Sequence, residues 1–437
     1  MELDLTLEKR LIKLFKHLGI DQAHLAARRP EDWAGLAQHH PEVIASLALI
    51  CPNPGMSSDL IHKFQDRCAI LTGDKGPAFE NIQRFLQNLP YVQTTELSDY
   101  DPLAWSDLMV DRLDEIDTCL FPFLDRIALP PLTPPAQSSG EVAGLTYTIR
   151  GTGPPLILCP LFLAPSQWEP LIPKLSKHYT TITLGGTKIG AVALLESRGR
   201  AHGYRQMIRA MIESTSLKAG DVLLEIGCGS GAVMRAMVAQ THKQNAITGI
   251  DINAYLLAEG KALVQKENLE DLIQTQEGSA VSIPFPDNSF DITYSVTVIE
   301  EVDANAMIAE MIRVTKPKGQ IAIIARAVDL PYVVNLPLEP DLKSKVEQPG
   351  GGVSPGGCAD ASLYTRFQNA GLTNLTTFPY LAPFDTADPY VLDFLEPGFL
   401  QDLNPEEREA WTTAKTKAKN TFFIAWPHHC AVGTKPV

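Results

Sequence analysis

The sequence has no long apolar run and no apolar leader. Its longest apolar stretch lies near Val43 to Cys51, well short of the roughly 20 residues that a membrane-spanning helix needs. The first ten residues include Glu2, Asp4 and Glu8, at positions where a secretory signal would be apolar. We therefore expect neither a secreted protein nor a membrane partner.

Cysteine is scarce, and acidic residues outnumber basic ones. The seven cysteines are widely spaced and form no Cys-x-x-Cys pair, so we expect no disulfide framework and no structural zinc site, and a cytoplasmic location fits best. Lys and Arg number 37 against 51 Asp and Glu, which leaves a net charge of −14. Such a surface repels phosphate backbones and argues against a nucleic-acid partner.

Proline and glycine mark two boundaries along the chain. A Pro-rich segment at 130–141 predicts a semi-rigid linker between residues 1–129 and residues 142–195. A weaker boundary between Gly185 and Arg200 predicts that another domain begins near residue 196. Short buried strands are predicted on both sides of the linker, at Val43–Ile50, Cys68–Thr72, Leu156–Cys159 and Thr181–Leu184.

From about residue 200, strand and helix patterns alternate. The predicted strands are Asp221–Ile226, Ala246–Ile250, Ile273–Glu277, Phe290–Ser295 and Gln320–Ala325. Apolar residues at helical spacing from Ala304 to Ile312 predict a helix before the last strand, with Asp303 as its N-cap. Alternating elements of this kind predict a parallel sheet with helices on both faces, which binds ligands at the carboxyl ends of its strands.

A glycine-rich turn follows the first of these strands. Glu225 precedes three glycines, Gly227, Gly229 and Gly231, and Asp251 ends the next strand. Glycines let a ligand approach bare backbone, and a carboxylate at the next strand end can accept the hydroxyls of a ribose. Two ligand classes fit this pattern. One is a dinucleotide, which would make the protein an NAD(P)-dependent oxidoreductase, and the other is an adenosine-containing sulfonium.

The run Glu-x-Gly-x-Gly-x-Gly resembles motif I of class I S-adenosylmethionine-dependent methyltransferases. Two later segments, Gly278–Asp291 and Arg313–Gly319, resemble that family before its fourth and fifth strands. The resemblance implies an α/β fold, a Rossmann-like methyltransferase sheet with a terminal antiparallel strand at Phe422 to Ile424, in a domain at 196–437. It also implies S-adenosyl-L-methionine as cofactor. Glu225 would repel a pyrophosphate, whereas the ammonium group of a methionine moiety would tolerate it.

The same resemblance implies roles for the residues around the turn. Gly227, Gly229 and Gly231 would shape the pocket of the methionine moiety, with Cys228 packed beside them. Asp251 would hold the ribose.

Further roles follow for the adenine and for the walls of the pocket. Ile252, Ser279 and Ala280 would meet the adenine, although the family usually has an acidic residue where Ser279 stands. Ser295 would line the floor of the pocket, and Tyr204, on a helix before the first strand, would fold over the cofactor.

Methyl transfer from a sulfonium is an in-line displacement of an activated group, so positioning and desolvation can supply much of the rate. A base is needed only where the acceptor keeps its proton. The candidate catalytic residues are Glu300 and Glu301 after the fourth strand and His428 after the last one. The alternative interpretation of the two glutamates is a solvated helix start. The run His428-His429-Cys430 lacks metal-ligand spacing, so no metal is expected.

Two insertions, near 328–357 and 381–419, are rich in apolar and aromatic residues. In the resembling family such insertions commonly cover the acceptor pocket, and aromatic walls suit a small organic acceptor. Alternatively, they pack as a lid or as contacts of a homo-oligomer without touching substrate.

Residues 1–195 resemble an α/β-hydrolase in shuffled order. Segments at 18–47, 71–74 and 99–105 are similar to its late half, and segment 151–175 is similar to its early half. The order implies a circular permutation across the linker. Arg29, Gly76 and Asp101 stand where the family has its nucleophile, acid and histidine, so we expect no hydrolysis. The remaining hypothesis is a non-enzymatic interaction protein that uses this domain as its working surface.

Overall fold

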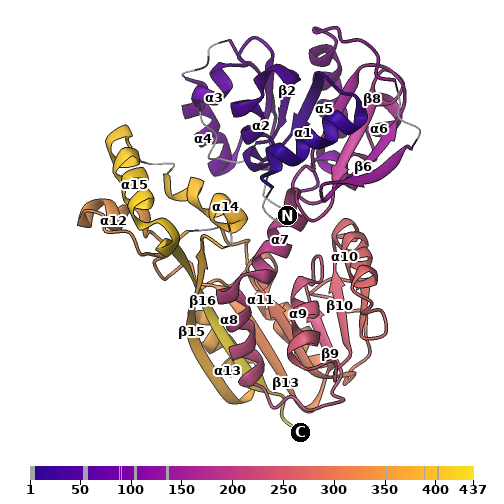
Figure 1. Ribbon diagram of the computed structural model, residues 1–437. Coiled ribbons are helices and arrows are strands. Elements are labelled where there is room, and N and C mark those ends of the chain that lie inside the picture. The colour runs from indigo at the N-terminus through magenta and orange to yellow at the C-terminus, as the bar shows by residue number, and fades with distance from the viewer. Residues whose placement is uncertain are drawn as a thin grey trace. The chain divides into compact units, whose positions relative to one another are not determined.

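The structure is a computed structural model that describes residues 5–52, 58–87, 89, 91–102, 106–133, 137–350, 352–387, 389–400 and 403–437. The chain divides into two compact units, unit 1 from Met1 to Leu194 and unit 2 from Leu195 to Val437 (Figure 1). The sequence placed this boundary between residues 195 and 196. Among the helices of the described residues, none has the length and apolarity needed to cross a bilayer.

Unit 1 is built on an eight-stranded sheet with the order β4-β3-β2-β1-β7-β8-β6-β5. Its strands are β1 (Ala23–Ala27), β2 (Ile44–Ile50), β3 (Cys68–Gly73), β4 (Gln93–Leu97), β5 (Ser139–Val142), β6 (Leu145–Arg150), β7 (Pro155–Leu158) and β8 (Thr180–Gly185). The strands from β4 to β8 in this order run parallel, and β6 and β5 are antiparallel at one edge. Every residue of β2 is buried, whereas β6 alternates buried and exposed residues, as central and half-exposed strands do.

Helices cover both faces of this sheet. On one face lie α1 (Leu7–Leu18), α2 (Ala34–His39), α3 (Ser58–His62) and α4 (Gly76–Leu86). On the other face lie α5 (Leu108–Leu124) and α6 (Ile172–Leu175). Helix α7 (Gly190–Arg200) then leads the chain from unit 1 into unit 2.

The four strands predicted around the linker are confirmed as β2, β3, β7 and β8. The predicted linker is too long at its end. Ser139, Gly140 and Glu141 belong to β5, which pairs with β6. The Ser-Gly composition predicted a linker there. A strand at a sheet edge is paired on one side only, so it tolerates residues with little strand propensity. Residues 134–136 of the linker lie outside the described residues.

Unit 2 has a second eight-stranded sheet with the order β11-β10-β9-β12-β13-β16-β14, and β15 also pairs with β16. Its strands are β9 (Leu223–Ile226), β10 (Ile247–Asp251), β11 (Ile273–Glu277), β12 (Phe290–Val296), β13 (Thr315–Arg326), β14 (Val333–Val334), β15 (Thr373–Asp385) and β16 (Phe423–Thr434). Strands β9 to β13 run parallel, and β16 is antiparallel to β13. The order reverses between β9 and β12, where ligands of such sheets bind.

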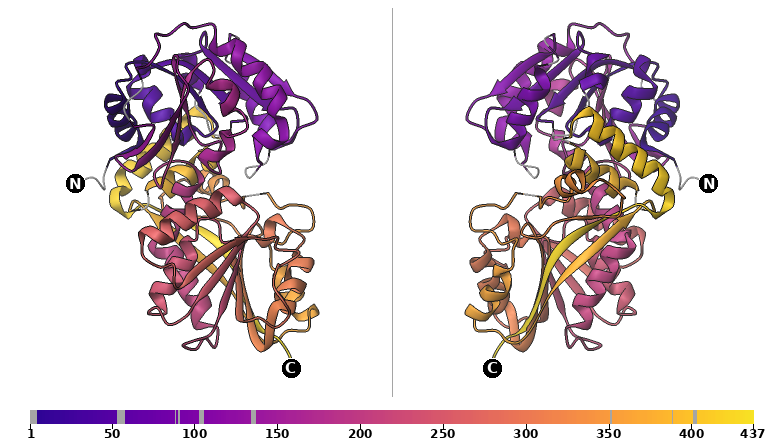
Figure 2. Two further views of the ribbon diagram at one scale, coloured as in Figure 1. Left: turned by 90° about the vertical axis from the view of Figure 1, so that its right-hand side faces the viewer. Right: turned by 90° about the vertical axis from the view of Figure 1, so that its left-hand side faces the viewer.

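Helices also cover both faces of the second sheet (Figure 2). One face carries α8 (His202–Glu213), α9 (Ala232–Gln240) and α10 (Ala254–Lys266), and the other carries α11 (Ala304–Val314) and α13 (Ser362–Asn369). Three more helices, α12 (Pro340–Val346), α14 (Pro389–Leu400) and α15 (Pro405–Ala418), belong to the two predicted insertions. Asp303 is confirmed as the N-cap of α11, because its Oδ1 accepts the N–H of Ala306 at 2.8 Å.

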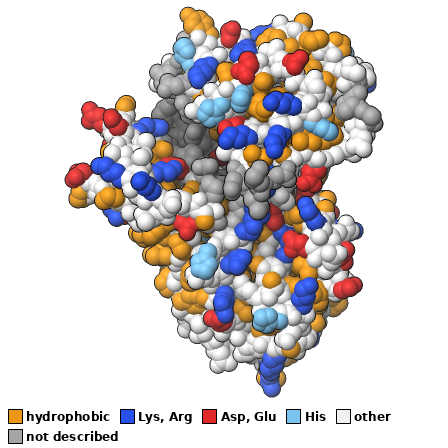
Figure 3. All heavy atoms as spheres, viewed as in Figure 1, with side chains coloured by type: hydrophobic (Ala, Val, Ile, Leu, Met, Phe, Trp, Pro, Cys, Tyr) orange, Lys and Arg blue, Asp and Glu red, His pale blue; other side chains and the backbone are white. Residues whose placement is uncertain are grey.

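The five predicted parallel strands of unit 2 are confirmed as β9 to β13, and the terminal antiparallel strand is confirmed as β16. The start of the second insertion is wrong. Leu381 to Asp385 belong to β15, and Phe384 is fully buried against β16. Its aromatic side chain is part of the core, which a count of aromatic residues could not distinguish from a pocket wall. On the face drawn in Figure 3, acidic and basic side chains are interspersed, so the negative charge is not gathered there into one patch.

Candidate functional site

The glycine-rich turn, Gly227–Gly231, leaves β9 and enters α9. Gly227, Gly229 and Gly231 have φ angles of 71°, 52° and 74°, which residues with a side chain rarely adopt. A Cβ on Gly227 would also collide with the side chain of Val298. The turn therefore needs glycine both for its backbone angles and for the close approach of the segment after β12.

Asp251, at the end of β10, is held by two backbone amides. Its Oδ2 accepts the N–H of Gly229 at 2.8 Å, and its Oδ1 accepts the N–H of Asn253 at 2.8 Å. Burial raises the pKa of this carboxyl, and the two amide bonds oppose that rise. Each oxygen keeps a further lone pair. The group is thus fixed in place and still able to accept hydrogen bonds from hydroxyls.

Glu225 is only 2% exposed, at the end of β9. Its Oε2 accepts a hydrogen bond from the hydroxyl of Tyr294 at 3.0 Å. Burial raises the pKa of Glu225 to about 8, against the opposing effect of the Tyr294 bond. Arg198 and Arg235 also lower this pKa, but burial outweighs them. The sequence did not foresee Tyr294, because nothing in its local pattern shows which strand it faces.

The residues assigned to the adenine and the pocket wall differ in exposure. Ile252 is 72% exposed just beyond β10, so its side chain is free to cover a flat ring. Cys228 and Ala280 are buried. Burial raises the pKa of the Cys228 thiol well above its usual value, so this group is a packing residue, as the sequence suggested.

The hydroxyls of Ser279 and Ser295 both form hydrogen bonds within the protein. Ser279 accepts the N–H of Val281 at 3.3 Å on a loop after β11. Ser295 is buried in β12 and donates its hydroxyl to the carbonyl of Ile226 at 2.9 Å. Ser295 therefore ties β12 to β9 below the turn, and its hydroxyl is already bonded.

Glu300 and Glu301 lie on a 3-10 turn, η4 (Ile299–Glu301), after β12. The alternative of a solvated helix start is wrong for Glu300, which is fully buried. Its Oε1 accepts the backbone N–H of Arg326, and burial raises the pKa of its carboxyl. Glu301 is partly exposed and pairs with the Arg326 guanidinium at 2.6 Å. The two glutamates thus hold the end of β13 from two sides.

Tyr204 of α8 lies against His428. The expectation that His428 follows the last strand is wrong, because His428 lies within β16 and pairs with Arg326 of β13. The side chains of Tyr204 and His428 are both buried, and their ring centroids are 6.4 Å apart at an interplanar angle of 70°. Neither the Tyr204 hydroxyl nor Nε2 of His428 meets a hydrogen-bond partner among the described residues. His429 faces the opposite way, with Tyr364 at 2.8 Å and Asp329 at 2.8 Å. The alternation of a strand separates the two histidines.

Helix α7 contributes residues that the sequence analysis missed. The Arg198 guanidinium lies 5.0 Å from the centre of the Tyr204 ring, and its charge lowers the pKa of Glu225 against the effect of burial. A cation over an aromatic face is attracted to it. No motif marks Arg198, since it belongs to the weak boundary segment and only the fold brings it to the site.

A buried ion pair ties α7 to the glycine-rich turn. Glu196 pairs with Arg235 of α9, and both side chains are 7% exposed. Glu196 also accepts the hydroxyl of Ser230 at 2.8 Å, and Arg235 donates to the carbonyl of Ser230 at 2.8 Å. Glu196 and Arg235, 39 residues apart in the chain, therefore both hydrogen-bond to Ser230 of the turn and fix its position.

A chain of aromatic rings leads from His428 into the insertions. Trp426 lies 5.6 Å from His428, and Tyr332 and Phe384 each lie 6.4 Å from Trp426, measured between ring centroids. Trp426 and Tyr332 are partly exposed, whereas Phe384 is buried. Tyr332 of the first insertion thus completes an aromatic wall with Phe384 of β15 and Trp426 near the start of β16.

Unit 1 carries different groups at the corresponding ends of its strands. Arg29 follows β1, is fully buried, and lies 5.1 Å from the centre of the Phe162 ring. A Cβ on Gly76 would collide with the carboxylate of Asp101. The three positions assigned to a catalytic triad therefore hold a buried cation, a bare backbone and a carboxylate.

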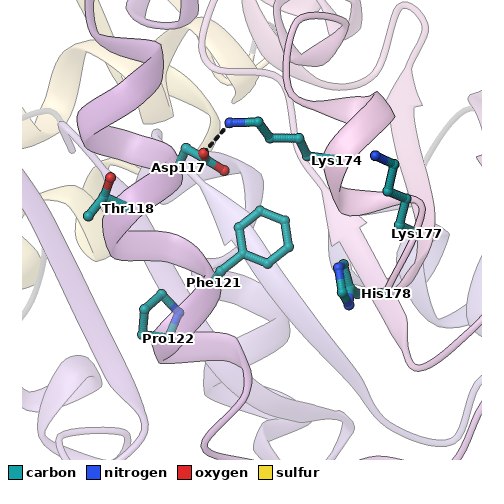
Figure 4. A pocket seen from close by; sticks show the side chains of 7 residues that line it. All are labelled: Asp117, Thr118, Phe121, Pro122, Lys174, Lys177 and His178. Carbon is teal, nitrogen blue, oxygen red and sulfur yellow. Dashed lines mark hydrogen bonds and ion pairs between the residues drawn. The ribbon is translucent and has the colours of Figure 1, made fainter.

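Unit 1 also has an open surface hollow of about 430 Å³ between α5 and the segment around α6 (Figure 4). Lys174 ion-pairs with Asp117 at its rim, and the Phe121 ring lies 5.7 Å from that of His178. Its lining residues are Asp117, Thr118, Phe121, Pro122, Lys174, Lys177 and His178. Its lining does not include the three positions assigned to a triad, and Lys174 and Asp117 are already paired with each other.

Comparison with known proteins finds similarity in part of unit 2. Residues 224–323 match the family described as a methyltransferase domain. The chain is 31% identical over 131 residues to a demethylmenaquinone methyltransferase of Lactobacillus johnsonii, covering 30% of this chain and 52% of that protein. It is 32% identical over 110 residues to the sterol 24-C-methyltransferase ERG6B of Gibberella zeae, covering 25% of this chain and 28% of that protein.

The chain thus spans about half the length, or less, of these curated relatives. Among solved structures, the YcgJ protein of Bacillus subtilis is 17% identical, with a TM-score of 0.37, over 53% of this chain and 99% of that one.

Proposed function

We propose that the protein transfers a methyl group from S-adenosyl-L-methionine to a small organic acceptor. The observation that carries the proposal is the glycine-rich turn with Asp251 fixed beside it and the buried Glu225 beneath it. The family match over residues 224–323 supports the same reaction class. The curated relatives are named for quinone and sterol acceptors, which supports a small molecule here.

The residues present fit this cofactor. The turn carries no side chain at Gly227, Gly229 or Gly231, so a ligand can approach its backbone. Asp251 would hold the ribose hydroxyls, Ile252 and Ala280 would contact the adenine, and Glu225 would face the ammonium of the methionine moiety. When bound, the cofactor supplies an activated methyl group. The chain supplies position, a dry pocket and places for protons.

Titration calorimetry with S-adenosylhomocysteine tests the cofactor. We expect saturable binding to the full chain and none with NAD or NADP. Binding of a nicotinamide dinucleotide in place of S-adenosylhomocysteine would favour the oxidoreductase alternative. The carboxyl of Glu225 at the turn argues for the sulfonium nucleoside, because a pyrophosphate would be repelled there once the group ionises.

On the acceptor side, we propose Glu300, Glu301 and His428 as the residues around the reacting group, with Tyr204 between them and the cofactor. Glu301 would act mainly through Arg326, its ion-pair partner at 2.6 Å. The aromatic wall of Trp426 and Tyr332 would contact an apolar acceptor. Transfer of labelled methyl from S-adenosylmethionine to a metabolite extract would identify the acceptor by its gain in mass.

We further propose that unit 1 is a circularly permuted, non-hydrolytic α/β-hydrolase-like domain. Its sheet order supports a permutation. Moving residues 1–129 behind residues 142–195 would renumber the strands so that the sheet reads 1-2-4-3-5-6-7-8, nearly in chain order from edge to edge. In the real chain, β1 starts beside β7 in the middle of the sheet and β5 begins at the far edge.

The catalytic positions support the absence of hydrolysis. A buried arginine at position 29 and a glycine at position 76 supply neither nucleophile nor acid. A fluorophosphonate probe, which labels activated serines, should leave unit 1 unlabelled in the full chain. Labelling of a serine in residues 1–194 would contradict this part of the proposal.

A further inference from the structure

Three buried polar atoms, one on α8, one on η4 after β12 and one within β16 opposite the end of β13, have no hydrogen-bond partner among the described residues. They are Nε2 of His428, the hydroxyl of Tyr204 and Oε2 of Glu300. Their side chains are at most 1% exposed. Buried polar atoms are normally paired, so three orphans in one place indicate a missing polar partner.

The three groups belong to one cluster. His428 and Tyr204 have ring centroids 6.4 Å apart. Arg326 faces His428 across the β13–β16 pair, and its backbone N–H binds Glu300. Burial raises the pKa of Tyr204 and the charge of Glu300 raises it further, whereas Arg198 and Thr297 lower it. Thr297 does not meet the Tyr204 hydroxyl at hydrogen-bond geometry.

The tautomer of His428 is set by its other nitrogen. Nδ1 lies 2.9 Å from the carbonyl oxygen of Trp426. A carbonyl only accepts, so Nδ1 carries the hydrogen and Nε2 of the neutral ring presents a bare lone pair. The unpaired atom is therefore an acceptor, and its partner must be an O–H or N–H donor.

The surroundings keep His428 neutral. Burial lowers its pKa to about 3, the Trp426 carbonyl opposes this, and Arg198, Arg326 and His429 lower it further. These groups come from α7, β13 and β16, and Tyr204 and Glu300 complete the surroundings. A neutral imidazole with a free Nε2 is thus present throughout the physiological pH range.

Resting on the proposed function, we infer that the methyl acceptor is a hydroxylated aromatic compound whose O–H donates to Nε2 of His428. The aromatic frame follows from Trp426 and Tyr332, partly exposed rings 6.4 Å apart, of which Trp426 lies 5.6 Å from His428. Such faces pack well against a flat ring. A hydroxyl fits both groups, because it donates to the lone pair of Nε2 and its oxygen can accept from the Tyr204 hydroxyl.

The step balances in atoms and charge. The acceptor proton passes to Nε2, a bond forms between the acceptor oxygen and the methyl carbon, and the carbon–sulfur bond breaks with its electron pair going to sulfur. The positive charge leaves the sulfonium and ends on the imidazole. Because the nearby sulfonium charge disappears in the same step, the imidazolium forms at constant net charge.

The first test is equilibrium binding to the full chain saturated with S-adenosylhomocysteine. Naphthols and dihydroxybenzenes are compared with their methyl ethers by calorimetry. We expect each hydroxyl compound to bind about 10-fold more tightly than its ether, the value of one hydrogen bond to a buried acceptor. Equal binding of the two would overturn the inference.

The second test uses His428→Phe, which keeps a ring but removes the lone pair. We expect the preference for hydroxyl over ether to vanish and kcat with phenols to fall by about 10²- to 10⁴-fold, while S-adenosylhomocysteine binds as before. The loss should shrink for nitrophenols that are already ionised at the assay pH. The control is His202→Phe, an exposed histidine at the start of α8, which should change neither quantity.

The outcomes separate the two proposals. If S-adenosylhomocysteine gives no heat, the proposed function itself fails. If it binds but only compounds without a hydroxyl are methylated, or if His428→Phe keeps full activity and preference, only the present inference fails. A melting temperature of the variant close to that of the unaltered chain shows that any loss is not due to misfolding.

Discussion

At the scale of single residues, burial and hydrogen bonding together set the pKa of an acidic side chain. Asp251 and Glu225 both end strands of the same sheet, yet they differ in surroundings. Asp251 accepts two backbone N–H bonds, whereas Glu225 accepts one hydroxyl and is 2% exposed. Bonds to the ionised form favour it, and desolvation opposes it. Asp251 therefore suits a sugar, and Glu225 suits a cation that restores its charge.

Asp251→Ala should weaken the binding of S-adenosylhomocysteine by about 10- to 100-fold, because a hydrogen bond to a charged group contributes about 1.5–3 kcal/mol. Titration calorimetry measures the change. Asp271→Ala, at an exposed position after α10, is the control and should leave the affinity unchanged. Equal affinities of the two variants would show that Asp251 does not hold the cofactor.

Glu225→Gln should remove a pH dependence of stability. The folded carboxyl has a pKa of about 8 against 4.5 when unfolded, so between these values the folded state binds more protons. The free energy of unfolding of the cofactor-free chain should therefore fall as pH rises from 5 to 8, by up to about 1.4 kcal/mol per pH unit. Urea unfolding at pH 5, 7 and 8.5 measures it, and the variant should be more stable than the unaltered chain only at the higher values. A wild-type curve that rises over this range would contradict the prediction.

At the scale of elements, helix α7 helps to fix the conformation of the glycine-rich turn. Glu196 and Arg235 form a buried pair that also grips Ser230 on both its hydroxyl and its carbonyl. Glu267 binds the outer side of Arg235 at 3.0 Å. Three positive φ angles in five residues cost conformational entropy to fix, and this network offsets part of that cost.

Arg235→Met should destabilise unit 2 by about 3–5 kcal/mol, because it leaves Glu196 buried without its partner. Replacing both residues, with Glu196→Leu added, should recover most of that loss. Calorimetric unfolding of the full chain measures the effect. Arg209→Met breaks the exposed pair with Glu213 on α8 and should change stability by only about 0.5 kcal/mol. A double variant as unstable as the single one would show that charge burial is not the cause.

At the scale of the whole molecule, two sheets of different connectivity follow each other along one chain. Unit 2 begins its sheet at the centre, with β9, and builds outward in both directions. In unit 1 the first strand, β1, lies beside β7 near the centre, and the strands from β5 to β8 form the other half of the sheet. Every residue assigned to the cofactor belongs to unit 2, so the two units should respond differently to it.

S-adenosylhomocysteine at about 100 times its dissociation constant should stabilise unit 2 by about 2.7 kcal/mol. Hydrogen exchange with mass spectrometry should show slower exchange in peptides spanning 223–232 and 247–256. Peptides from β1, β2 and β3 should exchange as they do without the ligand. Equal protection in both units would mean that the ligand also binds unit 1 or couples the two tightly.

The sequence by itself determined the parts that local pattern encodes. Apolar runs and the three glycines predicted the parallel strands and the glycine-rich turn, because a strand–turn–helix unit is specified within about 30 residues. Asp303 as an N-cap is likewise a local matter.

Only the tertiary structure decided the rest. It buried Glu300, which the sequence could also place in solvent, moved Leu381–Asp385 from an insertion into β15, and brought Arg198 over Tyr204. It also left Nε2 of His428 without a partner by turning Nδ1 to a carbonyl. These outcomes depend on contacts between residues remote in the chain, whose packing sets burial and hydrogen bonding, and no periodicity records such contacts.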